Sequence, residues 1–364
     1  MYDVVIIGGS FAGLATAMQL RGHRVLLIDQ RPIGSHQMST CGIPLPTVQA
    51  VGTESAILES HDAFVLHTAG RTIRFALRIP YVTFDYRAFC RAMLAQTDAE
   101  VWVTKATGWG DGLVQTARGP VETRFVVDAA GWHSVRRHSA APAAAQVTGY
   151  GMETELPIRP PGGPGLHFYY EHNIIRNGYA WLFPCGASTR IGLCTFDKDV
   201  RLGPILDAFL ARFGLECGPT HGGVMSTAWR EPVTDAVFRV GDAAGQCLPM
   251  TAEGIRTAIY GGIHCGQALA AALAGAITPD AARARYRAQV HSLASYHYRL
   301  LKMQQAIAWA PEWLRAATGW VAARPAMTDW LMDHYLGNTG WVVPAATTAA
   351  PAPPLGAAQL GHPA

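Results

Sequence analysis

Residues 4–13 read Val-Val-Ile-Ile-Gly-Gly-Ser-Phe-Ala-Gly, four apolar residues followed by a glycine-rich turn. The apolar residues predict a buried strand, and residues 14–20 have the apolar spacing of a helix. A second apolar run, residues 25–28, predicts another buried strand. A strand–turn–helix–strand unit of this kind is typical of a parallel sheet covered by helices on both faces. The start of the chain therefore predicts a Rossmann-like α/β domain.

The glycine-rich turn is suited to binding a dinucleotide. Gly8 permits the tight turn after the strand, Gly13 lets the helix pack closely, and the small Ser10 stands where backbone must approach a pyrophosphate. Asp29 ends the second strand, where a carboxylate would bind ribose hydroxyls and disfavour a 2′-phosphate. We therefore expect FAD or NAD rather than NADP. The residues predicted to bind it are Gly8, Gly9, Ser10, Ala12, Gly13, Asp29, Gln30 and Arg31.

The composition of the 364-residue chain excludes several other classes of protein. Hydrophobic residues make up 49%, enough for a large core, and the net charge of +3 is too small for a dedicated nucleic-acid binder. The seven cysteines are odd in number and lack CxxC spacing, and the histidines lack paired-ligand spacing, so we expect neither a disulfide framework nor a metal site. Without a signal peptide or a transmembrane run, we expect a cytoplasmic protein.

A second motif lies more than 220 residues beyond the first. Residues 240–246 read Val-Gly-Asp-Ala-Ala-Gly-Gln, and residues 249–255 add a proline and a Glu-Gly-Ile sequence. This stretch resembles the second FAD signature of the hydroxylase-type flavoproteins, which include aromatic hydroxylases, flavin halogenases and geranylgeranyl reductases. The resemblance implies bound FAD, with Asp242 on its ribityl chain. It further implies a helix near Gly254 whose positive N-terminal end points at the N1/O2 edge of the flavin.

The same resemblance implies further cofactor contacts. Arg87 matches the arginine of the family that reaches the pyrophosphate or ribityl region; a surface arginine is the alternative. The remaining residues expected near FAD are Cys41, Gly131, Gly241, Pro249, Gly254 and Ile255. The family's middle motif usually places Asp before the glycine, but Ala130 precedes Gly131 here. Because that aspartate is tied to NADPH use in the hydroxylases, its absence weakens a hydroxylase function.

A third motif favours one branch of the superfamily. Residues 179–184 read Tyr-Ala-Trp-Leu-Phe-Pro and are similar to the YxWxFP element of geranylgeranyl reductases. Strand alternation places Tyr179, Trp181 and Phe183 on one face, which would form an apolar surface for a hydrophobic substrate; core packing is the alternative. Many reductases of this branch also have a Cys-Gly pair near the flavin, here Cys41-Gly42. The Cys41 thiol would donate a proton, contact the flavin or only pack.

These motifs predict the organisation of the chain. We expect an α/β fold with a Rossmann-like FAD-binding domain made of discontinuous segments (1–60, 81–148 and 225–277). An antiparallel-sheet substrate domain is expected at 61–80 and 149–224. Residues 278–343 are expected to be helical, in helices 279–309, 312–323 and 326–336, and their tryptophans would form a helical cap or an edge that touches membrane. Residues 344–364 hold five prolines and no Asp, Glu, Lys or Arg, which predicts a disordered tail.

The expected function is that of an FAD-dependent oxidoreductase. It would reduce, or in reverse dehydrogenate, a C=C bond of a hydrophobic, isoprenoid-like or secondary-metabolite substrate, with Cys41, Tyr179 or water supplying the proton. NADH, NADPH or a reduced electron carrier would be the donor. A monooxygenase and a non-catalytic FAD-binding protein are the alternatives. The expected partners are a small hydrophobic substrate, a carrier or electron-transfer protein, and peripheral contact with a membrane, but no nucleic acid.

Overall fold

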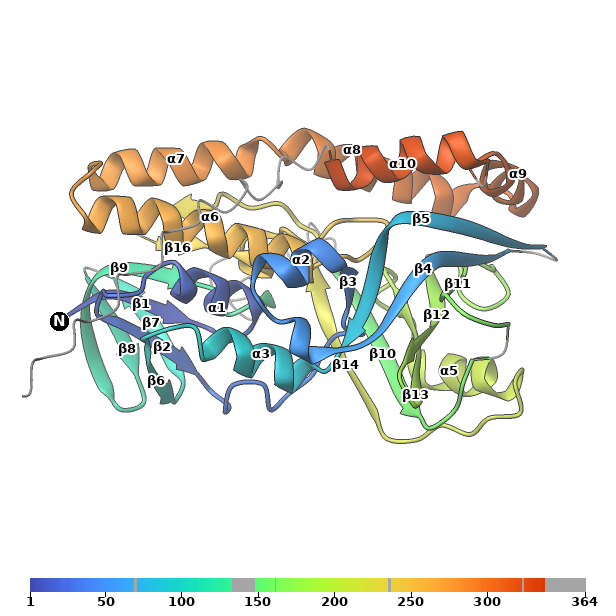
Figure 1. Ribbon diagram of the computed structural model, residues 1–364, viewed down its shortest axis with the longest axis horizontal. Coiled ribbons are helices and arrows are strands. Elements are labelled where there is room, and N and C mark those ends of the chain that lie inside the picture. The colour runs from blue at the N-terminus through green and yellow to red at the C-terminus, as the bar shows by residue number, and fades with distance from the viewer. Residues whose placement is uncertain are drawn as a thin grey trace, which may run out of the picture.

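The computed structural model describes residues 1–68, 71–110, 112–132, 148–160, 162–234, 237–322 and 324–337 (Figure 1). Two sheets lie side by side, and a layer of C-terminal helices runs across both of them (Figure 1). The predicted disordered tail, residues 344–364, lies outside the described residues. The cavity described below lies where the two sheets and the helices meet.

The first sheet contains the two strands predicted at the start of the chain. Its strand order is β15–β16–β9–β1–β2–β6, with β7 and β8 attached to β9. The β1, β2, β6, β9 and β16 strands pair in parallel, so that Val4 stands opposite both Val25 and Phe125. The strands are β1 (Tyr2–Ile7), β2 (Val25–Asp29), β6 (Glu100–Val103), β7 (Ala106–Gly110), β8 (Leu113–Thr116), β9 (Gly119–Asp128), β15 (Val233–Thr234) and β16 (Val237–Arg239).

Helices from opposite ends of the chain pack against each other over this sheet. The helix after the glycine turn, α1 (Phe11–Met18), lies against α6 (Ile255–Leu273). A Cβ atom on Gly262 would come within 2.5 Å of the Ala12 carbonyl oxygen, and one on Gly266 within 2.6 Å of the Thr16 carbonyl oxygen. Their missing side chains therefore allow the two backbones to approach. The other short helices of this region are α2 (Leu45–Ala50), η1 (Glu54–Ala56), α3 (Tyr86–Leu94) and η3 (Gly241–Ala244).

The second sheet is the predicted antiparallel sheet, and its strands extend beyond the residues 61–80 and 149–224 expected for it. Its order is β14–β10–β13–β12–β11–β4–β5–β3, mostly antiparallel, with α5 (Leu202–Ala211) packed on one face. Strands β4 and β5 pair antiparallel, from Ile57 opposite Phe84 to Thr68 opposite Arg71. The strands are β3 (Gly42–Pro44), β4 (Ile57–Thr68), β5 (Arg71–Phe84), β10 (Thr148–Leu156), β11 (Leu166–Tyr169), β12 (Gly178–Cys185), β13 (Ser188–Thr195) and β14 (Thr220–Ser226).

The C-terminal region is helical, but the continuous helix predicted at 279–309 is wrong. The structure has α7 (Pro279–His291) and α8 (Ala294–Trp309), separated at Ser292. The Ser292 hydroxyl donates to the Gln289 carbonyl oxygen at 2.6 Å, which competes with the helical pattern at this point. The chain continues as α9 (Glu312–Ala322) and α10 (Pro325–Gly337), and an Arg78–Asp329 ion pair of 2.5 Å joins α10 to β5.

The close contact of α1 with α6 makes a stability prediction. Gly266→Ala would place a methyl group within 2.6 Å of both Thr16 and Gln19, so we expect it to lower the free energy of unfolding by about 1–3 kcal/mol. The matched control is Gly203→Ala in α5, where nothing lies within 4 Å of the added Cβ, and no loss is expected there. Urea unfolding of both variants measures the difference. Equal stabilities would contradict the packing argument.

Candidate functional site

One large cavity connects all three motifs of the sequence. Its volume is about 800 Å³, and it extends from the first glycine turn, past Cys41 and the β12 wall, to the C-terminal helices. Most of the predicted site residues line it: Gly8, Gly9, Ser10, Ala12, Asp29, Gln30, Arg31, Cys41, Gly131, Tyr179, Trp181, Phe183, Gly241, Asp242, Gly254 and Ile255. Gly13, Arg87 and Pro249 are not among the residues that line it.

The first glycine turn has the shape that a nucleotide cradle requires. Gly8 has a φ of +106°, and a Cβ there would lie 2.2 Å from the Ala129 carbonyl oxygen. A Cβ on Gly13 would lie 1.9 Å from the Gly8 carbonyl oxygen. Ser10 precedes α1 and makes no side-chain cap, so the first backbone N–H groups of this helix are not capped by it. Such a helix end favours an anionic group such as a diphosphate.

Asp29 lies beside this turn. One of its carboxylate oxygens accepts from the Gly9 backbone N–H at 2.8 Å, and the other accepts from the Arg31 N–H at 2.9 Å. The carboxylate thus fixes the glycine turn relative to the end of β2. Its predicted contact with ribose hydroxyls stays a prediction.

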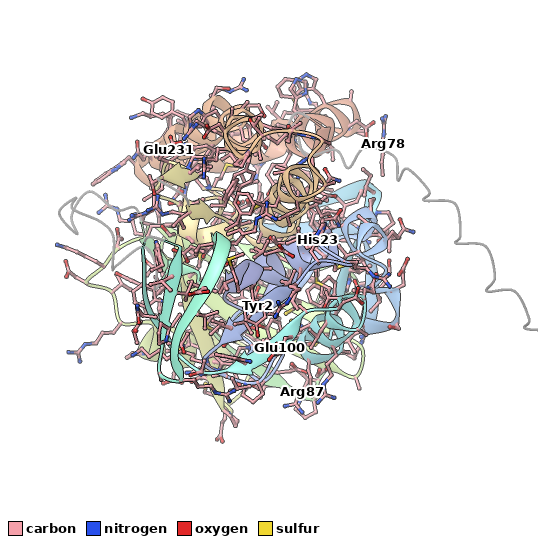
Figure 2. The ribbon with its side chains drawn as sticks, turned by 90° about the vertical axis from the view of Figure 1, so that its left-hand side faces the viewer. Tyr2, His23, Arg78, Arg87, Glu100 and Glu231 are labelled. Carbon is pink, nitrogen blue, oxygen red and sulfur yellow. The ribbon has the colours of Figure 1, made fainter. Side chains whose placement is uncertain are left out.

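Arg87 is placed differently from the other predicted cofactor residues. It is exposed near the start of α3, and Figure 2 shows it at the outer surface of the molecule. Its backbone packs against the 31–36 loop, since a Cβ on Gly34 would lie 3.2 Å from the Arg87 Cα. The predicted contact of Arg87 with FAD stays a prediction, and in this conformation the residue lies outside the cavity lining.

The second motif places a buried acid at the cavity. Asp242 lies in η3, and burial raises the pKa of its carboxyl group to about 6. Its nearest donor is the Ser226 backbone N–H, at a long 3.5 Å, and the buried Ser226 hydroxyl has no hydrogen-bond partner among the described residues. Helix α6 begins at Ile255 without a side-chain cap. Asp242 and the start of α6 line the same cavity as the glycine turn, whereas Ser226 is buried outside the cavity lining.

The residues present fit the FAD that the second motif implies. The glycine cradle leaves room for a diphosphate, and Gly241 approaches Ala12 closely enough that an added Cβ would lie 3.2 Å from the Ala12 Cβ. A ribityl hydroxyl in the cavity would give the Asp242 carboxyl group a closer hydrogen-bond partner than the Ser226 backbone N–H at 3.5 Å. The N-terminus of α6 would meet the pyrimidine edge of the ring.

The aromatic residues of β12 form a wall of the cavity. Tyr179, Trp181 and Phe183 all line it, as strand alternation predicts, and their ring centroids lie 5.9 and 6.4 Å apart in sequence order. Phe168 packs against Phe183 at 5.1 Å, and Tyr170 stacks on Tyr179 at 5.0 Å. The wall therefore contains more aromatic rings than the motif at residues 179–184 supplies, because Phe168 and Tyr170, which belong to no motif, add to it.

The polar ends of two wall residues are already engaged. The Tyr179 hydroxyl donates to the Thr251 carbonyl oxygen at 2.7 Å, and burial raises the pKa of this phenol well above 10. The Trp181 indole N–H donates to a Glu153 carboxylate oxygen at 3.0 Å. Tyr179 is therefore a weak acid whose proton is held by the backbone.

Cys41 lies at the cavity in a strained conformation. It is fully buried and has a φ of +58°, which is unusual for a residue with a side chain. Its thiol donates to the Ser39 carbonyl oxygen at 3.2 Å, and burial raises the pKa of the thiol well above 9 although nearby Arg190 opposes this. The residue is thus present as a neutral thiol.

No sequence motif marks the residues by which the C-terminal helices reach the cavity. Helices α8 and α10 close one end of the cavity with Tyr296, Arg299, Leu300, Met303, Trp330, Leu331, His334 and Tyr335. Tyr335 donates to Glu253, which forms a buried ion pair of 2.5 Å with Arg256 at the start of α6. The i, i+3 spacing of Glu253 and Arg256 can be read from the sequence, but nothing in the sequence indicates that Tyr335, 82 residues after Glu253, contacts this pair.

The described part of the chain has no group of three or more His, Cys, Asp or Glu side chains arranged to hold a metal ion. Among the same residues, no helix has the length and apolar character to cross a membrane.

The buried carboxylate of Asp242 makes a prediction about cofactor retention. Asp242→Ala removes the group predicted to bind the ribityl chain, so we expect the Kd for FAD to rise about 10- to 100-fold, the cost of a lost buried hydrogen bond. Asp62→Ala, at an exposed carboxylate outside the cavity lining, is the control. Flavin fluorescence on titration measures both. An Asp242→Ala protein that retains FAD like the control would contradict the assignment.

Comparison with known proteins agrees with the sequence motifs. No family model matches the chain. A digeranylgeranylglycerophospholipid reductase of Methanothermobacter thermautotrophicus is 27% identical over 71% of this chain and 74% of its own. A geranylgeranyl diphosphate reductase of Rhodobacter capsulatus is 26% identical over 78% of this chain and 79% of its own.

Solved structures show the same fold. A geranylgeranyl bacteriochlorophyll reductase-like protein of Thermoplasma acidophilum has a TM-score of 0.76 at 20% identity and covers 85% of this chain and 88% of its own. A flavin-dependent brominase has a TM-score of 0.69 at 16% identity, covering 93% of each chain. The predicted fold class is therefore confirmed. The chain is an FAD-dependent oxidoreductase that is similar in sequence to geranylgeranyl reductases.

Proposed function

We propose that this enzyme reduces C=C bonds of an isoprenoid chain, using bound FAD. The observation that carries the proposal is the continuous cavity, in which the nucleotide cradle and the aromatic wall face the same space. The chemistry that bound FAD would supply here is hydride transfer to the C=C bond. The relatives at 26–27% identity are named for geranylgeranyl substrates, which supports an isoprenoid here.

The protein's own residues would bind and orient the two reactants. The Gly8–Gly13 turn and the α1 N-terminus would hold the diphosphate, and Asp242 would hold the ribityl chain. The wall of Tyr179, Trp181 and Phe183 would hold an apolar chain and exclude water from it. We further propose NADH, NADPH or a small reduced carrier protein as the electron donor.

The C-terminal helices support a second proposal, that the enzyme docks on a membrane surface at the cavity. Trp309 and Trp313 are 76% and 71% exposed, and Trp320 and Trp330 are about half exposed. Cations accompany them, since Arg176 lies over Trp309 and Arg324 over Trp320. Tryptophan with arginine suits the interface of an anionic bilayer, and Trp330 also lines the cavity that would receive the chain.

The reaction is tested by anaerobic turnover. FAD-loaded enzyme reduced with dithionite and mixed with geranylgeranyl diphosphate should reoxidise its flavin and yield a product heavier by two hydrogens per bond reduced. Trp181→Ala should raise KM or lower kcat about tenfold or more with unchanged FAD content, because it removes a large part of the wall. A requirement for oxygen would instead establish a monooxygenase, and no reoxidation under either condition would establish a non-catalytic FAD protein.

Membrane docking is tested with vesicles. We expect the enzyme to sediment with phosphatidylglycerol vesicles, and the Trp309→Ser/Trp313→Ser double variant to bind them at least tenfold more weakly, because it loses two exposed apolar rings. Val103→Ser, which removes an exposed apolar residue far from these helices in the sequence, is the control. Equal binding of all three proteins would reject these helices as the docking surface.

A further inference from the structure

Four residues form one row across the second sheet, and the row ends at Trp181 of the aromatic wall. In the strand register, Glu153 on β10 stands opposite His221 on β14 and opposite Gly192 on β13. Gly192 in turn stands opposite Trp181 on β12. The row His221–Glu153–Gly192–Trp181 therefore crosses four neighbouring strands, drawn from segments up to 68 residues apart.

The missing side chain in this row lets its members touch. A Cβ on Gly192 would lie 2.5 Å from both the Glu153 Cβ and the Trp181 Cζ2. Without it, the indole reaches across β13 and donates to Glu153 Oε2 at 3.0 Å. On the other side, His221 Nε2 lies 2.7 Å from Glu153 Oε1. A single carboxylate thus joins the wall to a histidine.

The two ends of this connection lie in different surroundings. Glu153 is 2% exposed and lines the cavity, whereas the His221 side chain is 26% exposed and is not among the residues that line it. Protons can therefore reach His221 from solvent, while Glu153 faces the space proposed for the substrate. The His221–Glu153 pair therefore connects solvent with the cavity.

The other acids of the cavity are already committed. Asp29 holds the glycine turn, Asp242 faces the predicted ribityl site, and Glu253 is paired with Arg256. The Tyr179 hydroxyl is bonded to backbone, and burial keeps the Cys41 thiol a very weak acid. Among the carboxyl groups that line the cavity in the described residues, Glu153 is the one bonded to a partly exposed histidine.

The charges around the pair are few. Arg190 on β13 acts on both Glu153 and Cys41, but its guanidinium is bonded to Glu155 and to the Thr40 and Phe84 carbonyl oxygens. On the side of the 31–41 loop, His36 is close enough to His221 for the two charges to interact. Arg190 and His36 are thus the charged or titratable groups that the structure places near the pair.

We propose that Glu153 gives the substrate the proton required for C=C reduction and that His221 resupplies it from solvent. The proposal rests on the reductase function above. The π bond of the substrate C=C breaks, and the hydride that reduced FAD would supply, with its electron pair, forms the C–H bond at one carbon. The O–H bond of Glu153 breaks, and its proton forms the C–H bond at the other carbon. The resulting carboxylate takes a proton from the His221 imidazolium, and the neutral imidazole is then reprotonated from solvent.

The first test separates proton delivery from positioning of Trp181. In Glu153→Gln, the amide can still accept from the Trp181 N–H and donate to an unprotonated His221 nitrogen, but it carries no transferable proton. With FAD-loaded enzyme and geranylgeranyl diphosphate, we expect reoxidation of reduced flavin to slow about 100-fold or more, with KM within about twofold. Reduction of the flavin by its donor should not change. A rate like that of the wild type would overturn the proposal.

The second test addresses His221. His221→Gln should slow reoxidation about tenfold or more at neutral pH and remove one limb of the pH profile, and added imidazole buffer should restore part of the rate. His291→Gln, which alters the exposed His291–Glu231 pair, is the matched control and should match the wild type. Cys41→Ser tests the rival donor: if it, rather than Glu153→Gln, causes the large loss, the assignment to Glu153 is wrong.

A third readout does not depend on turnover. In the oxidised FAD-loaded enzyme, the indole N–H resonance of Trp181, identified through Trp181→Phe, should shift with the titration of His221 because Glu153 connects them. The shift should vanish in His221→Gln and persist in His291→Gln. A Trp181 resonance that does not change with the protonation of His221 would refute the coupling through Glu153. If the wild type reduces no isoprenoid yet shows this coupling, the proposed function fails while the pair itself stands.

Discussion

The close approach of α1 to α6 is the contact on which the rest of the site depends. Gly262 and Gly266 allow it, because any side chain at either position would strike the backbone of α1. The contact brings the first glycine turn against η3, where Gly241 meets Ala12 and Ala258. Two motifs more than 220 residues apart thereby become one cradle. A Rossmann-like unit by itself would supply only half of it.

Much of the fold and of the nucleotide end can be predicted from sequence because the signals are local. The apolar run at residues 4–7, the turn after it and Asp29 lie within thirty residues, and their roles follow from short-range geometry. The wall of β12 is similarly local, since alternation along one strand decides which side chains share a face. The continuous helix predicted across Ser292 was wrong because apolar spacing continues through a break that a single hydroxyl–carbonyl bond accompanies.

The rest of the site depends on strand register and tertiary packing, which no local pattern reports. Glu153 and His221 become partners because β10 and β14 pair in one particular register, and Gly192 matters only because it falls between Glu153 and Trp181. Tyr335 reaches Glu253 from a helix that carries no motif. Arg87 illustrates the reverse case, since a residue matched by motif lies on the surface of this conformation.

The order of the strands in the first sheet also affects how the protein matures. Strand β16 pairs with β9, and α6 packs on α1. The cradle therefore needs segments that precede and segments that follow the strands of the second sheet in the sequence. During synthesis, the first glycine turn leaves the ribosome long before α6 does. In the nascent chain, the apolar surface of α1 therefore stays uncovered by α6 until about residue 273 has emerged. Flavin capture is consequently a late event in biogenesis, and a bound yellow chromophore reports that the two halves of the cradle have joined.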